Sequence, residues 1–531
     1  MRGFFRSNQV LASAILIGIG GLLSRLLGLY RDRLLASSFG ASRELDIYYA
    51  AFRIPDFIYG VLILGAVSAA FIPVFASLST KEERDAFVSS SLTSILLFMG
   101  GICVLLFIFA PYLIALLAPG FSEAEKNTTI LLTRIMLLQP VFLAASSVAA
   151  SVLQSMHHFL ATALAPSFYN LGIIIGVIVF VPSFGLVGLA YGVVIGSLLH
   201  LLIQLPPLLA LGISIKPLVS LTKEVKKMLS LMGPRVLGII SDQVNLLVVT
   251  AIASLLALGS IAIFNLAQNI QAAPVGIIGI AIATAAFPTL TKSFNQNAKE
   301  EFSHTFLASF RLVLFFGIPL SILFILLRAQ IVRVVLGAGL FDWQDTRLTA
   351  ASLGIFGLSV FAQSIIPLLT RAFYSMHDTK TPVTVGVVSA AVNIGLALAL
   401  LPMLASPLPF YQYITQILKL EGIPDIRVLA LPLSFSLTMI GEFILLTLLL
   451  FSRIDGEHMA ALNTSWLKMV VSASLMALIT YISLRPLANM VDMTTGIGVF
   501  LQGLGAGVIG IAVYFGITYL LNENPLTIKR I

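Results

Sequence analysis

Seven charged residues lie within or beside two apolar runs near the N-terminus, and five of them could form a site: Arg25, Arg31, Asp32, Asp46 and Arg53. An ionisable side chain at membrane depth costs at least about 2.5–3.5 kcal/mol, so it usually faces a bundle interior or a water-filled cavity. Guanidinium groups bind phosphates through paired, charge-assisted hydrogen bonds. We therefore predict a substrate site for an anion, in which the three arginines bind and the two aspartates orient them or balance their charge.

The spacing of the arginines bears on whether they act together. Arg25 and Arg31 are six residues apart, so on a straight helix their side chains point about 120° apart. Gly28 lies between them, and a bend there would bring the two guanidinium groups together. In the alternative interpretation, Arg31, Asp32 and Arg33 form an ordinary charged cluster at a helix end.

A second group of polar residues has the chemistry of a cation site. Asp242, Asn245, Asp378 and Asn393 carry hard oxygen atoms of the kind that bind such cations. One interpretation is a site for the Na⁺ or H⁺ that drives transport. In the other, Asp242 and Arg235 lie seven residues apart on one helix face and neutralise each other.

The sequence contains none of the common enzyme signatures. It has no Gly-rich phosphate loop ending in Lys-Ser/Thr, no HExxH and no Gly-x-Ser-x-Gly. His157, His158 and His377 lack the carboxylate or cysteine spacing of a metal site, so we predict no metal and no other cofactor. The single cysteine, Cys103, excludes an internal disulfide bond. A transporter is expected rather than an enzyme.

These charges are carried by an unusually apolar chain. Of its 531 residues, 58% are hydrophobic and 10% are charged, and the mean hydropathy is +1.03, whereas a soluble domain carries about 25% charged residues. The apolar runs are too long for barrel strands. We therefore predict an all-α integral membrane protein with about fourteen transmembrane helices, given that a span needs about 20 apolar residues. The expected helices are 7–35, 46–78, 87–117, 128–155, 160–181, 186–211, 227–256, 261–291, 302–327, 346–374, 381–403, 428–452, 464–484 and 495–521.

The net charge of +8 is better explained by membrane topology than by binding to nucleic acid. Lysines and arginines concentrate in the loops of one side, above all in residues 216–227. Cytoplasmic loops carry such an excess. Both termini are therefore predicted to be cytoplasmic.

The chain contains an internal repeat. Residues 47–73 resemble residues 263–288, and Ser155–His158 resembles Ser375–Asp378 at nearly the same offset. Six helices separate equivalent positions, and an even number makes the two repeats parallel, related by an axis along the membrane normal.

The repeat predicts four regions. An N-terminal six-helix lobe occupies 1–215, a basic cytoplasmic connector 216–227, and a C-terminal six-helix lobe 228–455. Two additional transmembrane helices follow at 456–531.

A series of short motifs runs from the N-terminus to about residue 450. It comprises SRLLGLYRD (24–32), FGA (39–41), Asp46, AAFRIPD (50–56), AFIPVFA (70–76), APGF (118–121), QP (139–140), MGP (232–234) and FYSMHDTKTP (373–382). In these motifs the chain resembles the MurJ (MviN) family of lipid II flippases, in the multidrug/oligosaccharidyl-lipid/polysaccharide exporter superfamily.

The resemblance implies a fold and a substrate. Family members have two six-helix lobes that form a V-shaped, cationic cavity, and a groove for the lipid tail made with two C-terminal helices. Their transported partner is lipid II, a polyprenyl-pyrophosphate-linked disaccharide-pentapeptide. Arg25, Arg31 and Asp46 match charged positions of the family.

Four positions depart from the family pattern. Members often carry arginines where this chain has Tyr59 and Gly60, a glutamate in place of Leu64, and an arginine in place of Asn269. These departures leave the identity of the glycolipid open.

The function expected from the resemblance is translocation of lipid II from the cytoplasmic to the outer leaflet of the bacterial inner membrane by alternating access. The protein is expected to act as a monomer among membrane lipids. The alternatives are a flippase for another polyprenyl-pyrophosphate-linked glycan, a cation-coupled drug exporter, and a membrane scaffold that does not transport.

Overall fold

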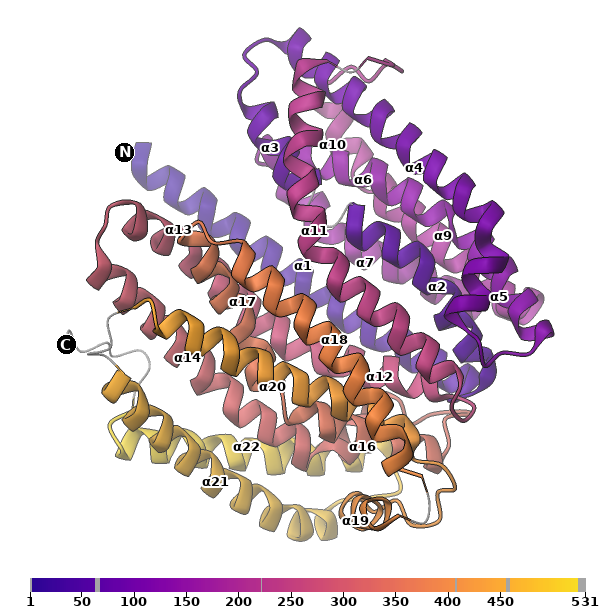
Figure 1. The fold of residues 1–531 in the computed structure, drawn as a ribbon, viewed down its shortest axis with the longest axis vertical. Coiled ribbons are helices and arrows are strands. Elements are labelled where there is room, and N and C mark those ends of the chain that lie inside the picture. Colours follow the sequence, from indigo (N-terminus) through magenta and orange to yellow (C-terminus); the bar gives the residue numbers. More distant parts are fainter. Residues whose placement is uncertain (1, 63–66, 221, 406–407, 455–458, 524–531) are drawn as a thin grey trace. The chain divides into compact units, whose positions relative to one another are not determined.

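The computed structural model describes residues 2–62, 67–220, 222–405, 408–454 and 459–523. Throughout these ranges the regular structure is helical (Figure 1). This confirms the predicted all-α class.

Ten helical spans among the described residues are long and apolar enough to cross a membrane, and the bent pair Trp343–Gly357 and Val360–Ser375 would make eleven. The other three predicted spans, 7–35, 46–78 and 227–256, include or adjoin residues outside the description. The count of about fourteen therefore stays a prediction, while a multi-pass membrane protein is confirmed.

The chain divides into two compact units, Met1–Ile261 and Ala262–Ile531. The first contains α1 (Arg2–Phe39), α2 (Arg43–Leu62), α3 (Val67–Ala76), α4 (Lys81–Leu117), α5 (Glu123–Met136), α6 (Leu138–Ser155), α7 (Phe159–Ile175), the π-helical turn η1 (Gly176–Phe180), α8 (Val181–Phe184), α9 (Leu186–Leu202), α10 (Leu205–Ala210) and α11 (Lys223–Ser254).

The second unit begins within α12 (Ser260–Pro274) and continues through the π-helical turn η2 (Val275–Ile280), α13 (Ala281–Asn295), α14 (Lys299–Leu326), α15 (Arg328–Val335), α16 (Trp343–Gly357), α17 (Val360–Ser375), α18 (Lys380–Met403), α19 (Pro409–Leu418), the 3₁₀ turn η3 (Arg427–Leu429), α20 (Ala430–Phe451), α21 (Met459–Met490) and α22 (Gly496–Leu520).

This division differs from the lobes expected from the sequence. The helix that opens the predicted 228–455 lobe, α11, packs against α2, α3 and α4 and so belongs to the first unit. The last residues of the predicted connector 216–227 are already helical, because α11 begins at Lys223 with Thr222 as its N-cap.

Close helix packing holds the first unit together. The backbone of α7 and η1 touches that of α9 at glycines. A Cβ on Gly172 of α7 would lie 2.2 Å from the Gly196 Cα, and one on Gly176 of η1 would lie 2.6 Å from the Gly192 Cα. Small residues permit such approach between helices in lipid, where dispersion forces rather than water drive association. α7 also packs along α1, which carries the predicted arginines.

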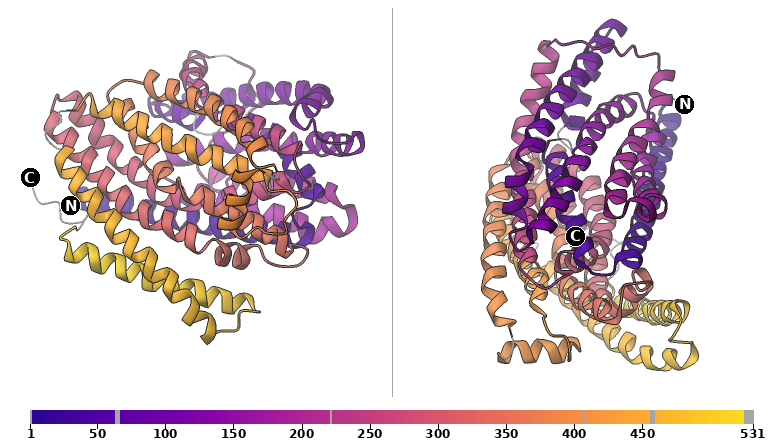
Figure 2. Two further views of the ribbon diagram at one scale, coloured as in Figure 1. Left: turned by 60° about the horizontal axis from the view of Figure 1, so that its bottom comes forward. Right: turned by 90° about the vertical axis from the view of Figure 1, so that its right-hand side faces the viewer.

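The second unit has an apolar core that extends to the two C-terminal helices. Phe306, Phe373 and Leu446 are enclosed together with Met476 and Tyr514. α21 packs against α14 and α22 against α15, and the left view of Figure 2 shows α21 and α22 side by side. The two helices outside the repeat thus share the core of the second unit.

The repeat is visible in local geometry. His157 and His377 both adopt left-handed backbone conformations, with φ of 62° and 60°. The backbone N–H of the residue after each histidine donates to a carbonyl of the preceding helix. The His158 N–H donates to the Leu153 carbonyl at 2.7 Å, and the Asp378 N–H donates to the Phe373 carbonyl at 3.0 Å. This is the hydrogen-bond pattern of a left-handed helix C-cap. The two histidines therefore end helices.

Candidate anion-binding site

Arg31 lies near the C-terminal end of α1 and is held by two side chains. Its Nε and Nη2 donate to Asp32 Oδ1 at 3.0 and 2.8 Å, and its Nη1 donates to Asn170 Oδ1 at 3.0 Å. The Arg31 side chain is 21% exposed, whereas that of Asp32 is 2% exposed. The guanidinium is therefore fixed in orientation, with its charge partly balanced by a buried carboxylate.

Asn170, on α7, connects Arg31 to the rest of α1. Its Nδ2 is placed to donate to the Ser24 carbonyl at 3.1 Å, to Ser24 Oγ at 3.3 Å and to the Pro166 carbonyl at 3.1 Å. Gly28 leaves room for it, since a Cβ there would lie 3.8 Å from Asn170 Oδ1. One neutral amide thus joins two helices and orients a cation.

Tyrosines surround this pair of helices. Tyr48 and Tyr49 on α2 are 3% and 9% exposed, with ring centroids 5.4 Å apart. Tyr169 precedes Asn170 on α7 and is half-buried.

Arg53 is positioned on α2 by a contact with α11. Its Nε donates to Thr250 Oγ1 at 3.0 Å, and the Thr250 hydroxyl donates in turn to the Leu246 carbonyl at 2.8 Å. Asp56, one turn later, interacts electrostatically with Arg53. The first unit therefore holds a second cation beside a carboxylate, as it holds Arg31 beside Asp32.

Asp46 has a different environment from the one predicted. Its side chain is 1% exposed, and its Oδ2 accepts a hydrogen bond from the Gly259 N–H at 2.8 Å and lies 3.7 Å from Arg43 Nη1. Gly259 has φ of +82°, and a Cβ there would lie 1.8 Å from the Ala41 carbonyl oxygen. Asp46 therefore anchors the turn between α11 and α12, and these surroundings favour a positioning role over contact with a substrate.

Arg25 is half-buried on α1. The helix is continuous through Gly28. Six residues on a regular helix place the Arg25 and Arg31 side chains about 120° apart, and their convergence on one anion stays a prediction.

Two of the four residues predicted to form a cation site, Asp378 and Asn393, lie far apart along the axis of α18. Asp378 precedes α18 and Asn393 lies thirteen residues inside it, which is about 20 Å along the axis at the rise of an α-helix. The two therefore do not share one coordination shell. Asn245 is half-buried on α11, and the side chain of Asp242 lies outside the described residues.

Asp378 is instead a helix cap. It accepts from the Thr381 N–H at 3.0 Å, from the Thr381 hydroxyl at 2.6 Å and from Arg453 Nη1 at 2.6 Å. Partial burial alone would raise the pKa of Asp378, but the hydrogen bonds from Thr381 and Arg453 outweigh it and lower the pKa to about 2. The carboxylate is therefore charged and already occupied.

Among the described residues there is no group of three or more His, Cys, Asp or Glu arranged to hold a metal ion. His377 Nε2 lies 3.0 Å from Asn295 Oδ1, and His158 Nδ1 lies 2.9 Å from the Met156 carbonyl. Both rings have local partners at the helix ends.

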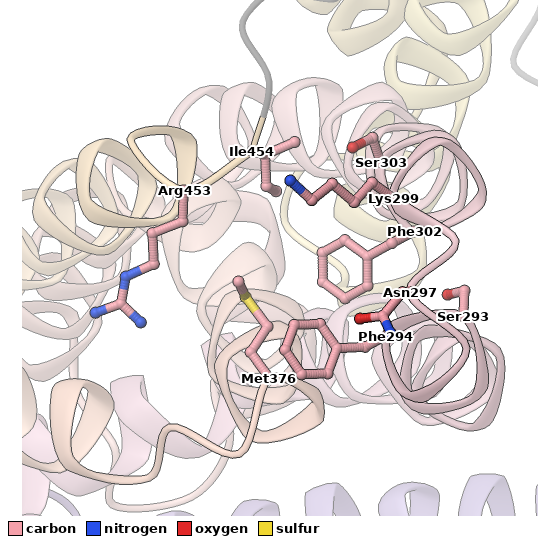
Figure 3. A pocket seen from close by; sticks show the side chains of 9 residues that line it. All are labelled: Ser293, Phe294, Asn297, Lys299, Phe302, Ser303, Met376, Arg453 and Ile454. Carbon is pink, nitrogen blue, oxygen red and sulfur yellow. The ribbon is translucent and has the colours of Figure 1, made fainter.

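A pocket of about 90 Å³ lies at one end of the second unit. Figure 3 shows the rings of Phe294 and Phe302 and the thioether of Met376 lining it, with Lys299 reaching toward Ile454 and the Arg453 guanidinium directed away. It is small and mainly apolar, and it contains none of the residues predicted to bind the substrate.

Sequence reasoning missed Asn170, Thr250 and the tyrosines. Asn170 stands in an otherwise apolar predicted helix, and a buried amide at membrane depth is a signal of the same kind as a buried charge. Thr250 gives no such signal, because a threonine hydroxyl is commonly satisfied by its own helix.

Comparison with known proteins identifies related sequences. The family model described as "Lipid II flippase MurJ" matches residues 35–495. The chain is 29% identical over 536 residues to the probable lipid II flippase MurJ of Buchnera aphidicola subsp. Acyrthosiphon pisum, an alignment that covers 98% of each chain.

The fold has known counterparts as well. A solved structure titled "Lipid II flippase MurJ, inward closed conformation" is similar with a TM-score of 0.76 at 25% identity, covering 97% of this chain and all of the other. An inward-facing multidrug resistance MATE family transporter of the MOP superfamily is similar with a TM-score of 0.64 at 14% identity, covering 82% of this chain and 97% of the other. The second likeness concerns the fold alone.

Proposed function

Because the chain belongs to the lipid II flippase MurJ family, we propose that it carries lipid II from the cytoplasmic to the outer leaflet of the bacterial inner membrane. Lipid II is the substrate named for the curated relatives. The observation that carries the proposal is the oriented guanidinium of Arg31 in an apolar, multi-pass protein. The protein is a transporter rather than an enzyme.

The chemistry of Arg31 fits a pyrophosphate headgroup. Guanidinium has five N–H donors in a rigid fork, and the bonds to Asp32 and Asn170 use three of them. A phosphate oxygen can therefore add to the fork without displacing Asp32. The carboxylate would balance the charge when the substrate is absent.

Arg25 and Arg53 would supply further positive charge along the first unit. Arg53 is already oriented by Thr250, and Arg25 is half-buried on the same helix as Arg31. Alternating access requires a ligand that binds one state better than the other. An anion that engages these arginines unequally in the two states would meet that requirement.

The experiment that tests the proposal is complementation of a flippase-depleted strain by Arg31→Ala, with Arg31→Lys and Arg33→Ala beside it. Arg33 is half-buried two residues further along α1 and serves as the matched control. We expect growth to fail with Arg31→Ala, to be weaker with Arg31→Lys because lysine lacks the planar fork, and to persist with Arg33→Ala. Full growth of Arg31→Ala, with membrane levels equal to wild type, would refute the mechanism.

A flippase for another polyprenyl-pyrophosphate-linked glycan is the second candidate. It is favoured by Tyr59 and Asn269, which replace cationic residues common in the family, while Leu64 lies outside the described residues. Native mass spectrometry with lipid II and with a second polyprenyl-pyrophosphate glycan, at equal concentrations, distinguishes the two. A preference for the second lipid would favour this candidate, and no preference for either over phospholipid would favour the drug exporter or the scaffold.

Coupling to Na⁺ or H⁺, cytoplasmic termini and a monomeric state belong to the same proposal. Asp242→Asn tests the first of these in proteoliposomes. Transport that keeps its dependence on the ion gradient in this variant would remove Asp242 from the coupling site.

A further inference from the structure

α19 (Pro409–Leu418) crosses the end of the long helices of the second unit. Figure 1 views it almost along its axis while α18 and α20 run across the picture, and the right view of Figure 2 shows it lying across the ends of neighbouring helices. It stands between two candidate membrane spans, Lys380–Met403 and Arg427–Phe451. A helix at that place lies at the depth where the hydrocarbon core ends.

Hydrogen bonds fix the rotation of α19. Arg347 of α16 donates from Nε to the Lys419 carbonyl at 2.9 Å and from Nη2 to the Glu421 carbonyl at 3.1 Å. The Tyr411 hydroxyl donates to the Ile423 carbonyl at 3.3 Å. Lys419 ends the helix in a left-handed conformation with φ of 59°. The face that α19 turns outward is therefore set by the protein itself.

The outward face consists of two rows. Tyr413 and Ile417, four residues apart, are 61% and 51% exposed, and Gln412 and Gln416, also four apart, are exposed beside them. Thr415, on the inner side, is only 8% exposed. Successive residues are separated by about 100° on a helix, so an apolar row and an amide row run parallel along the helix.

We propose that α19 lies in the membrane–water interface, with Tyr413 and Ile417 in contact with lipid and Gln412 and Gln416 turned to water. An amphipathic helix in the plane of the interface buries its apolar face in the boundary between headgroups and acyl chains, and tyrosine is enriched at that depth. The occupant is lipid rather than a protein because the chain on either side of α19 forms a candidate membrane span, Lys380–Met403 before it and Arg427–Phe451 after it. Leu408, which directly precedes α19, and Trp343, one turn before Arg347 on α16, are also exposed, at 44% and 63%.

Single spin labels test this arrangement in the full-length protein. The only native cysteine, Cys103, is buried, so Tyr413→Cys, Ile417→Cys, Gln412→Cys and Gln416→Cys can be labelled separately in a Cys103→Ala background. In nanodiscs of phosphatidylethanolamine and phosphatidylglycerol, the ratio of collisions with oxygen to collisions with a water-soluble nickel chelate reports the depth of each label. Leu448→Cys on α20 and Glu421→Cys provide the lipid and water references, since these side chains are exposed.

We expect the ratio at 413 and 417 to be severalfold higher than at 412 and 416, and to fall between the two references. Four ratios equal to that of the Glu421 label would overturn the proposal. So would four equal ratios at the Leu448 value, which would place the whole helix in hydrocarbon.

If a label prevents folding, Ile417→Trp in a Trp343→Phe, Trp466→Phe background provides a second measurement. Quenching of that tryptophan by brominated lipid is expected, and quenching only by aqueous acrylamide would contradict the proposal.

Discussion

Asn170 contributes more to the candidate site than a neutral side chain usually does. It accepts from Arg31 and faces two oxygen atoms of Ser24, so it fixes both the cation and the helix that carries it. An arginine on a flexible stem loses rotamer entropy when it binds an anion. A guanidinium that is already oriented loses less.

We therefore predict that Asn170→Ala weakens binding of lipid II without preventing folding. A hydrogen bond to a charged group contributes about 1.5–3 kcal/mol, and a loss at the lower bound corresponds to about tenfold weaker binding. Native mass spectrometry of the purified variant measures the affinity. Asn170→Asp should also bind lipid II weakly, because a carboxylate there would compete with the phosphate for Arg31.

Ser167→Ala is the control for these variants, since Ser167 is also buried on α7. It should bind lipid II like the wild type. Wild-type affinity in Asn170→Ala would mean that Asp32 alone orients Arg31, and Asn170 would then have no part in the site.

At the scale of secondary structure, the end of α22 shows how the two C-terminal helices are attached. Glu523 is 3% exposed, with Oε1 2.5 Å from Arg311 Nη2 of α14 and Oε2 3.8 Å from Lys468 Nζ of α21. The Tyr514 hydroxyl also donates to the Phe315 carbonyl at 2.9 Å. One buried carboxylate thus connects α22 with two helices of the second unit.

We predict that Glu523→Gln increases local unfolding at the end of α22 and the start of α21. Removing one partner of a fully buried ion pair costs about 3–5 kcal/mol, and the cost here is smaller because Arg311 and Lys468 are 30% and 31% exposed. Hydrogen–deuterium exchange should increase in peptides at the end of α22 and the start of α21, with α18 unchanged.

Glu421→Gln is the matched control for Glu523→Gln. Glu421 is 64% exposed and lies 3.8 Å from Arg347, and exposed ion pairs contribute little to stability. Hydrogen–deuterium exchange in the Glu421→Gln variant should equal that of the wild type. Unchanged exchange at α22 in Glu523→Gln would show that apolar packing alone holds these helices.

Across the whole molecule, the all-helical fold could be predicted because lipid leaves the backbone no other partner than its own helix. The arginines could be predicted because charge in an apolar run is costly. Their partners could not, because Arg31 and Asn170 are 139 residues apart and Asp46 and Gly259 are 213 apart. No local pattern connects positions so distant.

The segments that the repeat aligns, α2 in the first unit and α12 in the second, differ in their polar chemistry. Residues 47–73 match residues 263–288 at an offset of 216, so Asn269 aligns with Arg53. α2 carries Arg53 near Asp56, whereas on α12 Gln271 accepts a hydrogen bond from Gln363 at 3.1 Å. This contrast favours α2 over α12 as the segment that binds the anionic headgroup.

The last prediction concerns whether the exposed apolar surface of α4 is in contact with lipid or with water. Val104 lies within α4 and is 60% exposed, together with exposed Leu105 and Ile108. In water, a substitution at such an exposed site would be nearly neutral. In lipid, Val104→Arg should cost about 2.5–3.5 kcal/mol on the insertion scale. Folded protein in the membrane, measured by fluorescence-detected gel filtration of a fusion, should therefore fall sharply for Val104→Arg and stay unchanged for Val104→Leu. Equal yields of the two variants would mean that this face of α4 is covered by protein or water rather than by lipid.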